Sequence, residues 1–131
     1  MGKAEVALIR RAYRAFTRRD LDALTKLSHP EIELHTVTAV VAGTAVPYTG
    51  HAGLAAYIRD VEATWDELEL TPQEFNELED GRVLVAGRVL VQRGAARLDS
   101  PNTWLWEIDD GLVRSVRILA DPEIIDSLNA D

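Results

Sequence analysis

After Trp65 the apolar residues of this chain change their spacing to every second position, and they keep it as far as Ala120. Period-two alternation is typical of β-strands with one buried face. Three short polar turns interrupt the pattern, at Asp80-Gly81, Arg93-Gly94 and Asp109-Asp110-Gly111. Turns of this kind join antiparallel neighbours and leave no room for the crossovers of a parallel, doubly wound sheet. We therefore predict an antiparallel meander of four strands, over residues 68–79, 82–92, 97–108 and 112–120.

Before Trp65 the apolar spacing is mostly helical. Val6, Ile9, Tyr13 and Phe16 recur at steps of three and four, which predicts a first helix over residues 4–18. Asp20 is placed to cap a second helix that ends at His29-Pro30, and a third follows Thr49-Gly50. Strands are expected over residues 31–38 and around 46–48, and Asp121-Pro122-Glu123 predicts a short C-terminal helix.

These elements make one α+β domain over residues 1–131. The long strands follow one another without intervening helices, so the three N-terminal helices must cover one face of the sheet. We expect a strongly curved antiparallel sheet that forms a cone, with the short C-terminal helix beside it. The interior of such a cone is where a small ligand would bind.

Composition excludes several classes of protein. Twenty-two acidic residues against fourteen basic ones give a net charge of -8, which disfavours nucleic acid and anionic membrane surfaces as partners. Arginines do cluster in the first helix, either as a solvated face, which the spacing favours, or as a surface for an acidic partner. The chain has no cysteine, no apolar run of about 20 residues and no signal-peptide pattern, so we expect a cytoplasmic location. The three histidines lack metal-site spacing, and we predict neither a metal nor another cofactor.

Several segments resemble the nuclear transport factor 2-like superfamily, and its SnoaL-like branch in particular. They cover nearly the whole chain and keep the order expected of that fold: AYRAFTRRDLDAL at 12–24, HPEIEL at 29–34, YTGHAGLAAYI at 48–58 and WEIDDGLVRSVRILAD at 106–121. The resemblance implies a cone-shaped domain with an apolar pocket. It does not choose among isomerases, cyclases, hydrolases, dehydratases and non-catalytic binding modules, which all use this fold.

Two groups within this superfamily can be compared residue by residue. The alignment with ketosteroid isomerases puts Thr36 where their general-base aspartate lies, and puts the oxyanion carboxyl near Asn102 or Thr103. The alignment with limonene epoxide hydrolases keeps their arginine as Arg88 but replaces their two aspartates by Leu90 and Ile118. Neither set of acids is present, so neither activity is expected.

The hydrolase alignment implies that Leu84, Ala86, Arg88 and Leu90 point into the cone. Arg88 would then be a buried cation that needs an anionic partner. The alternative is that Arg88 lies on the outer face and pairs with Glu77, Glu79 or Glu107. Asp121 is either a catalytic acid or the cap of the last helix, and its neighbour Pro122 favours the cap. The candidate catalytic residues are Arg88 and Asp121, and the candidate substrate-binding residues are Phe16, Thr36, Tyr57, Arg88, Leu90, Trp106 and Ile118.

Two functions fit this sequence. The first is a pocket for an apolar small molecule, used either to bind it or to act on an apolar carbonyl or polyketide-like compound without a cofactor. The second is a non-catalytic assembly module. In that reading Val83, Val85, Val89 and Val91 lie opposite the pocket face and form a homodimer through the sheet.

Overall fold

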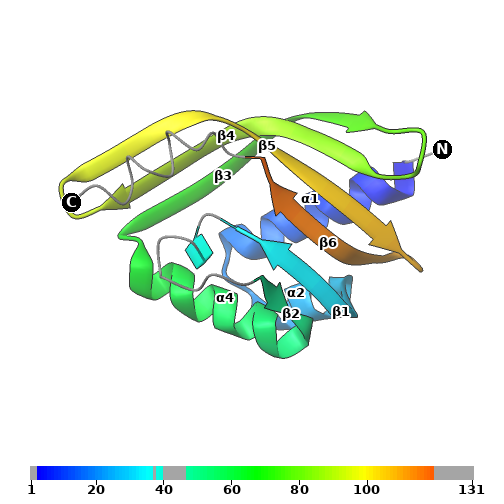
Figure 1. The fold of residues 1–131 in the computed structure, drawn as a ribbon, viewed down its shortest axis with the longest axis horizontal. Helices are drawn as coiled ribbons and strands as arrows, with labels where there is room; N and C mark the ends of the chain where they lie inside the picture. Colours follow the sequence, from blue (N-terminus) through cyan, green and yellow to red (C-terminus); the bar gives the residue numbers. More distant parts are fainter. Residues whose placement is uncertain (1–2, 37, 40–46, 120–131) are drawn as a thin grey trace.

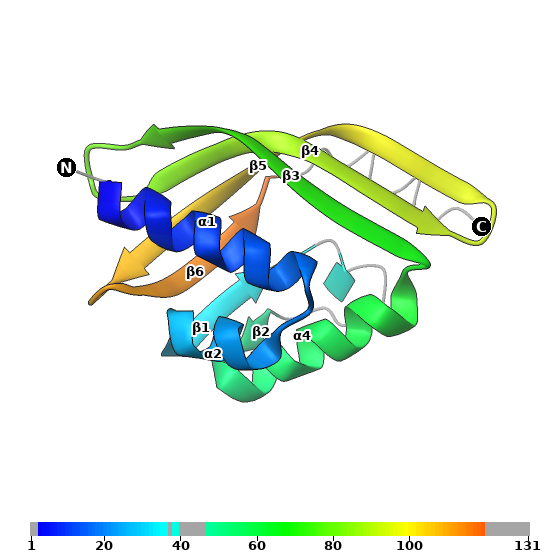
Figure 2. The ribbon, with the colours of Figure 1, turned by 180° about the vertical axis from the view of Figure 1, so that it is seen from behind.

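The computed structural model describes residues 3–36, 38–39 and 47–119 of the 131 in the chain. The described elements run in the order α1 (Lys3–Thr17), α2 (Leu21–Leu27), β1 (Ser28–His35), β2 (Tyr48–Thr49), α4 (Gly50–Thr64), β3 (Glu67–Glu77), β4 (Val83–Arg93), β5 (Ala96–Asp109) and β6 (Leu112–Ile118). Figure 1 shows one curved sheet made of all the strands. Figure 2, from behind, shows α1 crossing one face of that sheet with α2 and α4 beside it. The domain is therefore α+β, with the helices on one side.

The predicted meander is confirmed. β3, β4, β5 and β6 pair in sequence order, each antiparallel to the next. The expectation of an entirely antiparallel sheet is wrong, because β1 joins β6 in parallel and gives the strand order β2-β1-β6-β5-β4-β3. Such a parallel neighbour is possible because the chain between β1 and β6 includes α4 and the whole meander. The sheet does not close, and β2 and β3 are its edges.

The helices begin and end close to the predicted residues. The side chain of Asp20 caps α2 by accepting a hydrogen bond from the Ala23 amide at 3.1 Å. β1 starts earlier than predicted, directly after α2, and the Ser28 hydroxyl donates to the Leu24 carbonyl at that junction. Pro30 is tolerated in the strand because the β1–β6 register is irregular between Ser28 and Glu33. The predicted C-terminal helix lies outside the described residues.

The two faces of β4 are reversed relative to the prediction. Val83, Val85 and Val91 are the covered residues, with exposed fractions of 1%, 0% and 3%. Leu84, Ala86 and Leu90 are only half-buried, and Arg88 is exposed. Because the helices cover the valine face, these valines cannot form the outer dimer surface that the sequence suggested.

A close approach between β3 and β4 bends the sheet. Gly87 pairs with Pro72, next to a register shift between Pro72 and Glu74. A β-carbon on Gly87 would lie 2.1 Å from the Thr71 carbonyl oxygen, so only glycine fits there. Pro72 is compatible with β3 because an edge strand has unpaired positions that need no amide hydrogen. The bend places the inner faces of β3, β4 and β5 around one interior space.

Candidate functional site

The interior space is an apolar cavity between the helices and the inner face of the sheet. It has a volume of about 110 Å³, and its wall includes Phe16 from α1, Tyr57 from α4 and Trp104 from β5. Pockets for drug-sized ligands are several times larger, whereas a cavity of roughly 150 Å³ holds benzene. The space as it stands accommodates a molecule about the size of one ring.

Two polar side chains in this wall have no hydrogen-bond partner. Ser100 and Asn102 lie two residues apart on β5, so both point to the same face of the strand. Both are buried, at 9% and 8% exposed, and neither the Ser100 Oγ nor the Asn102 Nδ2 is hydrogen-bonded. A buried donor without a partner costs about 1–3 kcal/mol, so this pair marks a place where a ligand atom would be stabilised.

Tyr13 brings a hydroxyl from α1 to the same wall. Its ring packs against Trp104 and Trp106, with centroids 5.8 and 5.2 Å away. The Trp106 Nε1 donates to the Tyr13 hydroxyl oxygen at 3.3 Å. Burial raises the pKa of Tyr13, although the hydrogen bond from Trp106 opposes that shift. An indole nitrogen can only donate, so Tyr13 must accept this bond and keeps its own proton for another partner.

Tyr57 carries a second hydroxyl in the wall, and Thr38 and Trp65 line the cavity with it. The Trp65 Nε1 donates to the Thr38 Oγ1 at 2.9 Å. Burial raises the pKa of Tyr57 to about 12, while the charge of Arg19 and a hydrogen bond from Thr38 act to lower it. Thr38 thus accepts from the indole and is also one of the groups that act to lower the pKa of Tyr57.

Five of the predicted substrate-binding residues line the cavity: Phe16, Thr36, Tyr57, Trp106 and Ile118. The Thr36 Oγ1 accepts a hydrogen bond from the Ala39 amide at 3.1 Å, so this hydroxyl also keeps its proton to donate. The placement of these side chains agrees with the sequence analysis. Their contact with a substrate stays a prediction.

The placement predicted for Arg88 and Leu90 is wrong. Both lie on the outer face of β4, and neither lines the cavity. The alternative that placed Arg88 outside had the right face but the wrong partner, since its Nε donates to the Asp99 Oδ1 at 3.0 Å. An exposed ion pair of this kind stabilises little. Asp121 lies outside the described residues.

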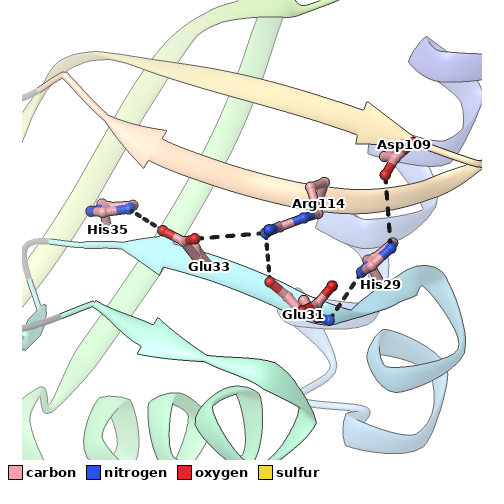
Figure 3. Close-up of polar contacts among 6 residues, drawn as sticks. All are labelled: His29, Glu31, Glu33, His35, Asp109 and Arg114. Atoms are coloured by element: carbon pink, nitrogen blue, oxygen red, sulfur yellow. Dashed lines mark hydrogen bonds and ion pairs between the residues drawn. The ribbon is translucent and has the colours of Figure 1, made fainter.

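A second set of polar contacts joins β1 to β6 and to the end of β5 (Figure 3). The Glu33 carboxylate lies 3.3 Å from the His35 Nε2 and 3.7 Å from the Arg114 Nη1. His29 Nε2 lies 3.8 Å from a carboxylate oxygen of Asp109. His35 also borders the cavity. In the part of the chain that the structure describes, no three His, Asp or Glu side chains are grouped to hold a metal ion.

The sequence analysis missed Ser100, Tyr13 and Thr38 as polar groups of the wall, and named Asn102 only as the place of a missing acid. One signal could have found the β5 pair. Ser100, Asn102, Trp104 and Trp106 occupy alternate positions, so placing Trp106 in the cavity places the other three there as well. Tyr13 shares the helical stripe of Phe16, so placing Phe16 in the cavity places Tyr13 there as well, whereas Thr38 gave no such signal.

The fold and the site together define a class of protein, a small α+β domain whose helices and curved sheet enclose one apolar cavity. The SnoaL-like domain family matches residues 9–116, and the chain belongs to that family. This confirms the resemblance found in the sequence. No match was found among curated proteins.

Solved structures repeat the same fold. TerC, crystallised with polyporic acid, is 24% identical, with a TM-score of 0.84 over 98% of this chain and 100% of that one. An NTF2-like protein of unknown function from Burkholderia pseudomallei is 25% identical, with a TM-score of 0.82 over 96% and 98%. A protein from Xanthomonas campestris, described as a "putative polyketide cyclase", is 16% identical, with a TM-score of 0.77 over 96% and 97%. No helix in the described residues is long and apolar enough to cross a membrane.

Proposed function

We propose that this protein binds a small apolar molecule through an electron-rich oxygen, such as a carbonyl or an enolate. The observation that carries the proposal is the pair of buried polar atoms without partners, Ser100 Oγ and Asn102 Nδ2, in a largely apolar wall. The Asn102 amide nitrogen is a donor only, so the ligand atom beside it must be an acceptor. A ligand oxygen would restore the hydrogen bond that folding removed from this amide.

The tyrosines also favour a ligand that accepts hydrogen bonds. Tyr13 accepts a hydrogen bond from the Trp106 indole and so has a proton to donate, and Tyr57 brings a second hydroxyl to the wall. The cavity therefore offers donors from α1, α4 and β5 within a largely apolar wall. Donors fixed in this way stabilise negative charge on an oxygen more strongly than water does. A carbonyl ligand would be held and polarised there.

The names of similar structures agree with this ligand class. TerC was crystallised with polyporic acid, and the Xanthomonas campestris protein is described as a "putative polyketide cyclase". We extend to this chain the class of an apolar, polyketide-like carbonyl compound. If it is also an enzyme, the donors would stabilise an enolate, and a base would have to remove the proton. Among the described lining residues only His35 has a basic side chain, and it is hydrogen-bonded to Glu33.

The test compares two ligands of similar size, acetophenone with its carbonyl and ethylbenzene without one. Thermal shifts should favour acetophenone in the unchanged protein. Asn102→Leu should remove that preference while leaving the response to ethylbenzene, because the replacement fills the space but donates nothing. Thr103→Val, on the outer side of the same strand, is the matched control and should behave as the original protein does. If neither compound shifts the transition, or if Asn102→Leu keeps the preference, the proposal is wrong.

The second candidate function, assembly, rests on a different observation from the one first expected. The outer face of the sheet carries Leu84, Leu90 and Leu105, all half-buried, around the exposed Arg88–Asp99 pair. A solvated face would carry fewer leucines, and this surface is suited to a two-fold contact with a second copy. We propose a homodimer through this face. Sedimentation at micromolar concentration should show a dimer that Leu105→Lys converts to monomer, and a monomeric original protein would contradict it.

A further inference from the structure

Arg19, in the turn between α1 and α2, is held in an unusual way. Its backbone φ is 53°, a left-handed conformation that residues with a β-carbon rarely adopt. The other described non-glycine residue with positive φ, Asp110, lies in an ordinary hairpin turn. A strained backbone of this kind costs about 1 kcal/mol or more and persists only where the surroundings fix it.

The surroundings that fix Arg19 are two carbonyls and one ring. The Nη1 donates to the Phe16 carbonyl at 2.6 Å, and the Nη2 donates to the Leu68 carbonyl at 2.9 Å, at the start of β3. The centre of the guanidinium lies 4.3 Å from the centroid of the Phe16 ring. The side chain therefore ties the end of α1 to β3 and keeps a positive charge against an aromatic ring of the cavity wall.

The Phe16 ring is in contact with Tyr57, one of the hydroxyl groups of the cavity wall. Phe16 stacks on Tyr57 with centroids 5.6 Å apart and planes only 13° from parallel. Arg19 also faces a polar groove with Glu62, Asp66, Glu67 and Glu69 in its wall, but among the described residues it forms no ion pair with any of them. No contacting carboxylate cancels its charge. The Arg19 charge acts to lower the pKa of Tyr57, against the larger effect of burial.

We propose that Arg19 is a positioning residue of the cavity: it fixes the Phe16–Tyr57 wall and makes the site prefer ligands whose oxygen is ionised. The inference rests on the proposed binding function and narrows its ligand class to acidic enols and phenols. Arg19 thus takes the part that the sequence analysis gave to Arg88, that of a fixed cation serving the cavity. It acts across the aromatic wall rather than by direct contact with the ligand.

The experiment uses 4-nitrophenol, a single-ring acid whose visible absorbance reports its ionised form. Its apparent pKa when bound is measured for the original protein and for Arg19→Met. Removing the charge should raise the pKa of the bound phenol by roughly one unit, a tenfold lower preference for the ionised form, with a much smaller change in affinity for the neutral form. A purely structural role for Arg19 would weaken the binding of both forms equally.

Two further variants make the result decisive. Arg19→Gly removes the charge but suits the positive φ, so it should fold and show the same raised pKa even if Arg19→Met does not fold. Arg10→Met is the matched control, since the Arg10 guanidinium also lies 4.3 Å from a ring centroid, that of Phe75, which does not line the cavity. It should leave the pKa of the bound phenol unchanged.

The possible failures are distinguishable. Equal pKa values of the bound phenol in the original protein, Arg19→Gly and Arg10→Met would overturn the role of Arg19 and leave the binding function standing. Failure of the original protein to bind 4-nitrophenol, together with acetophenone, would overturn both.

Discussion

The two faces of β4 carry similar aliphatic side chains and have opposite surroundings. Val83, Val85 and Val91 on one face are almost completely covered, whereas Leu84 and Leu90 on the other are half-buried. Hydrophobicity alone does not distinguish the two sets. The helices cover the valine face, and this side also contains the cavity with its tyrosines and its unpartnered amide. A strand with two apolar faces is thus oriented by the elements that pack on it.

We expect the largest difference in stability when a carboxylate is placed first on one face of β4 and then on the other. Val85→Asp puts a carboxylate at a site with no exposure and no partner, and should cost at least about 4 kcal/mol or prevent folding. Leu84→Asp, one residue away, should cost about 1–2 kcal/mol, because that side chain is half-exposed already. Urea unfolding followed by tryptophan fluorescence measures both. Similar losses at the two positions would mean that the outer face is also covered.

Larger side chains should also destabilise the covered face of β4 more than the outer face, with a smaller loss of stability than a buried charge causes. Gly87→Ala forces a β-carbon against the Thr71 carbonyl and should lower the free energy of unfolding by about 2–3 kcal/mol. Ala86→Val adds two methyl groups to the outer face and should change it by less than about 1 kcal/mol. The same urea titration compares the two variants. A tolerated Gly87→Ala would show that β3 and β4 separate easily at the bend.

The loss of stability at alkaline pH reports on the helix-covered side of the sheet, where the buried tyrosines lie. Burial raises the pKa of Tyr57 from 10.0 to about 12, so the folded state favours the protonated phenol. Its contribution is complete below pH 10 and is lost as the pH rises through 12, by on the order of 2 kcal/mol. Tyr13 and Tyr48 shift in the same direction, also mainly because of burial. Denaturant unfolding of Tyr57→Phe should therefore lose less stability over this range than the original protein, and an equal loss would contradict the prediction.

The smallest effect is expected at the outer ion pair. Arg88→Ala removes the contact with Asp99 and should lower the free energy of unfolding by less than about 1 kcal/mol, with the difference shrinking further in high salt. Thermal shifts with acetophenone and 4-nitrophenol should be unchanged. Loss of the ligand response in this variant would place Arg88 in the site after all and reverse the comparison of the two faces.

Much of the fold followed from local patterns. The change of apolar spacing at Trp65, the capping residue Asp20 and the three turns predicted the helices and the meander to within a few residues. The alternation along β5 also contained the positions of Ser100 and Asn102. These features depend on neighbours in sequence, and so the sequence expresses them directly.

This reasoning failed for β4, where it assigned the wrong face of the strand to the cavity. Its pattern contained a hint, since Arg88 and Gln92 share one face, and from Val83 to Val91 the opposite face carries no charged or amide side chain. The alignment with epoxide hydrolases led instead to the prediction that Arg88 points into the cone. Alternation defines two faces but cannot say which one the helices cover when both are aliphatic.

What the sequence determined by itself was the set of helices and strands, because hydrophobic period, caps and turns act over a few residues. What only the tertiary structure decided was which residues share the cavity. The indole of Trp106 reaches Tyr13 across 93 positions, and Arg19 reaches the Leu68 carbonyl across 49. Hydrogen-bond direction and charge at a site depend on such distant contacts, and these exist only once the helices have packed on one face of the sheet.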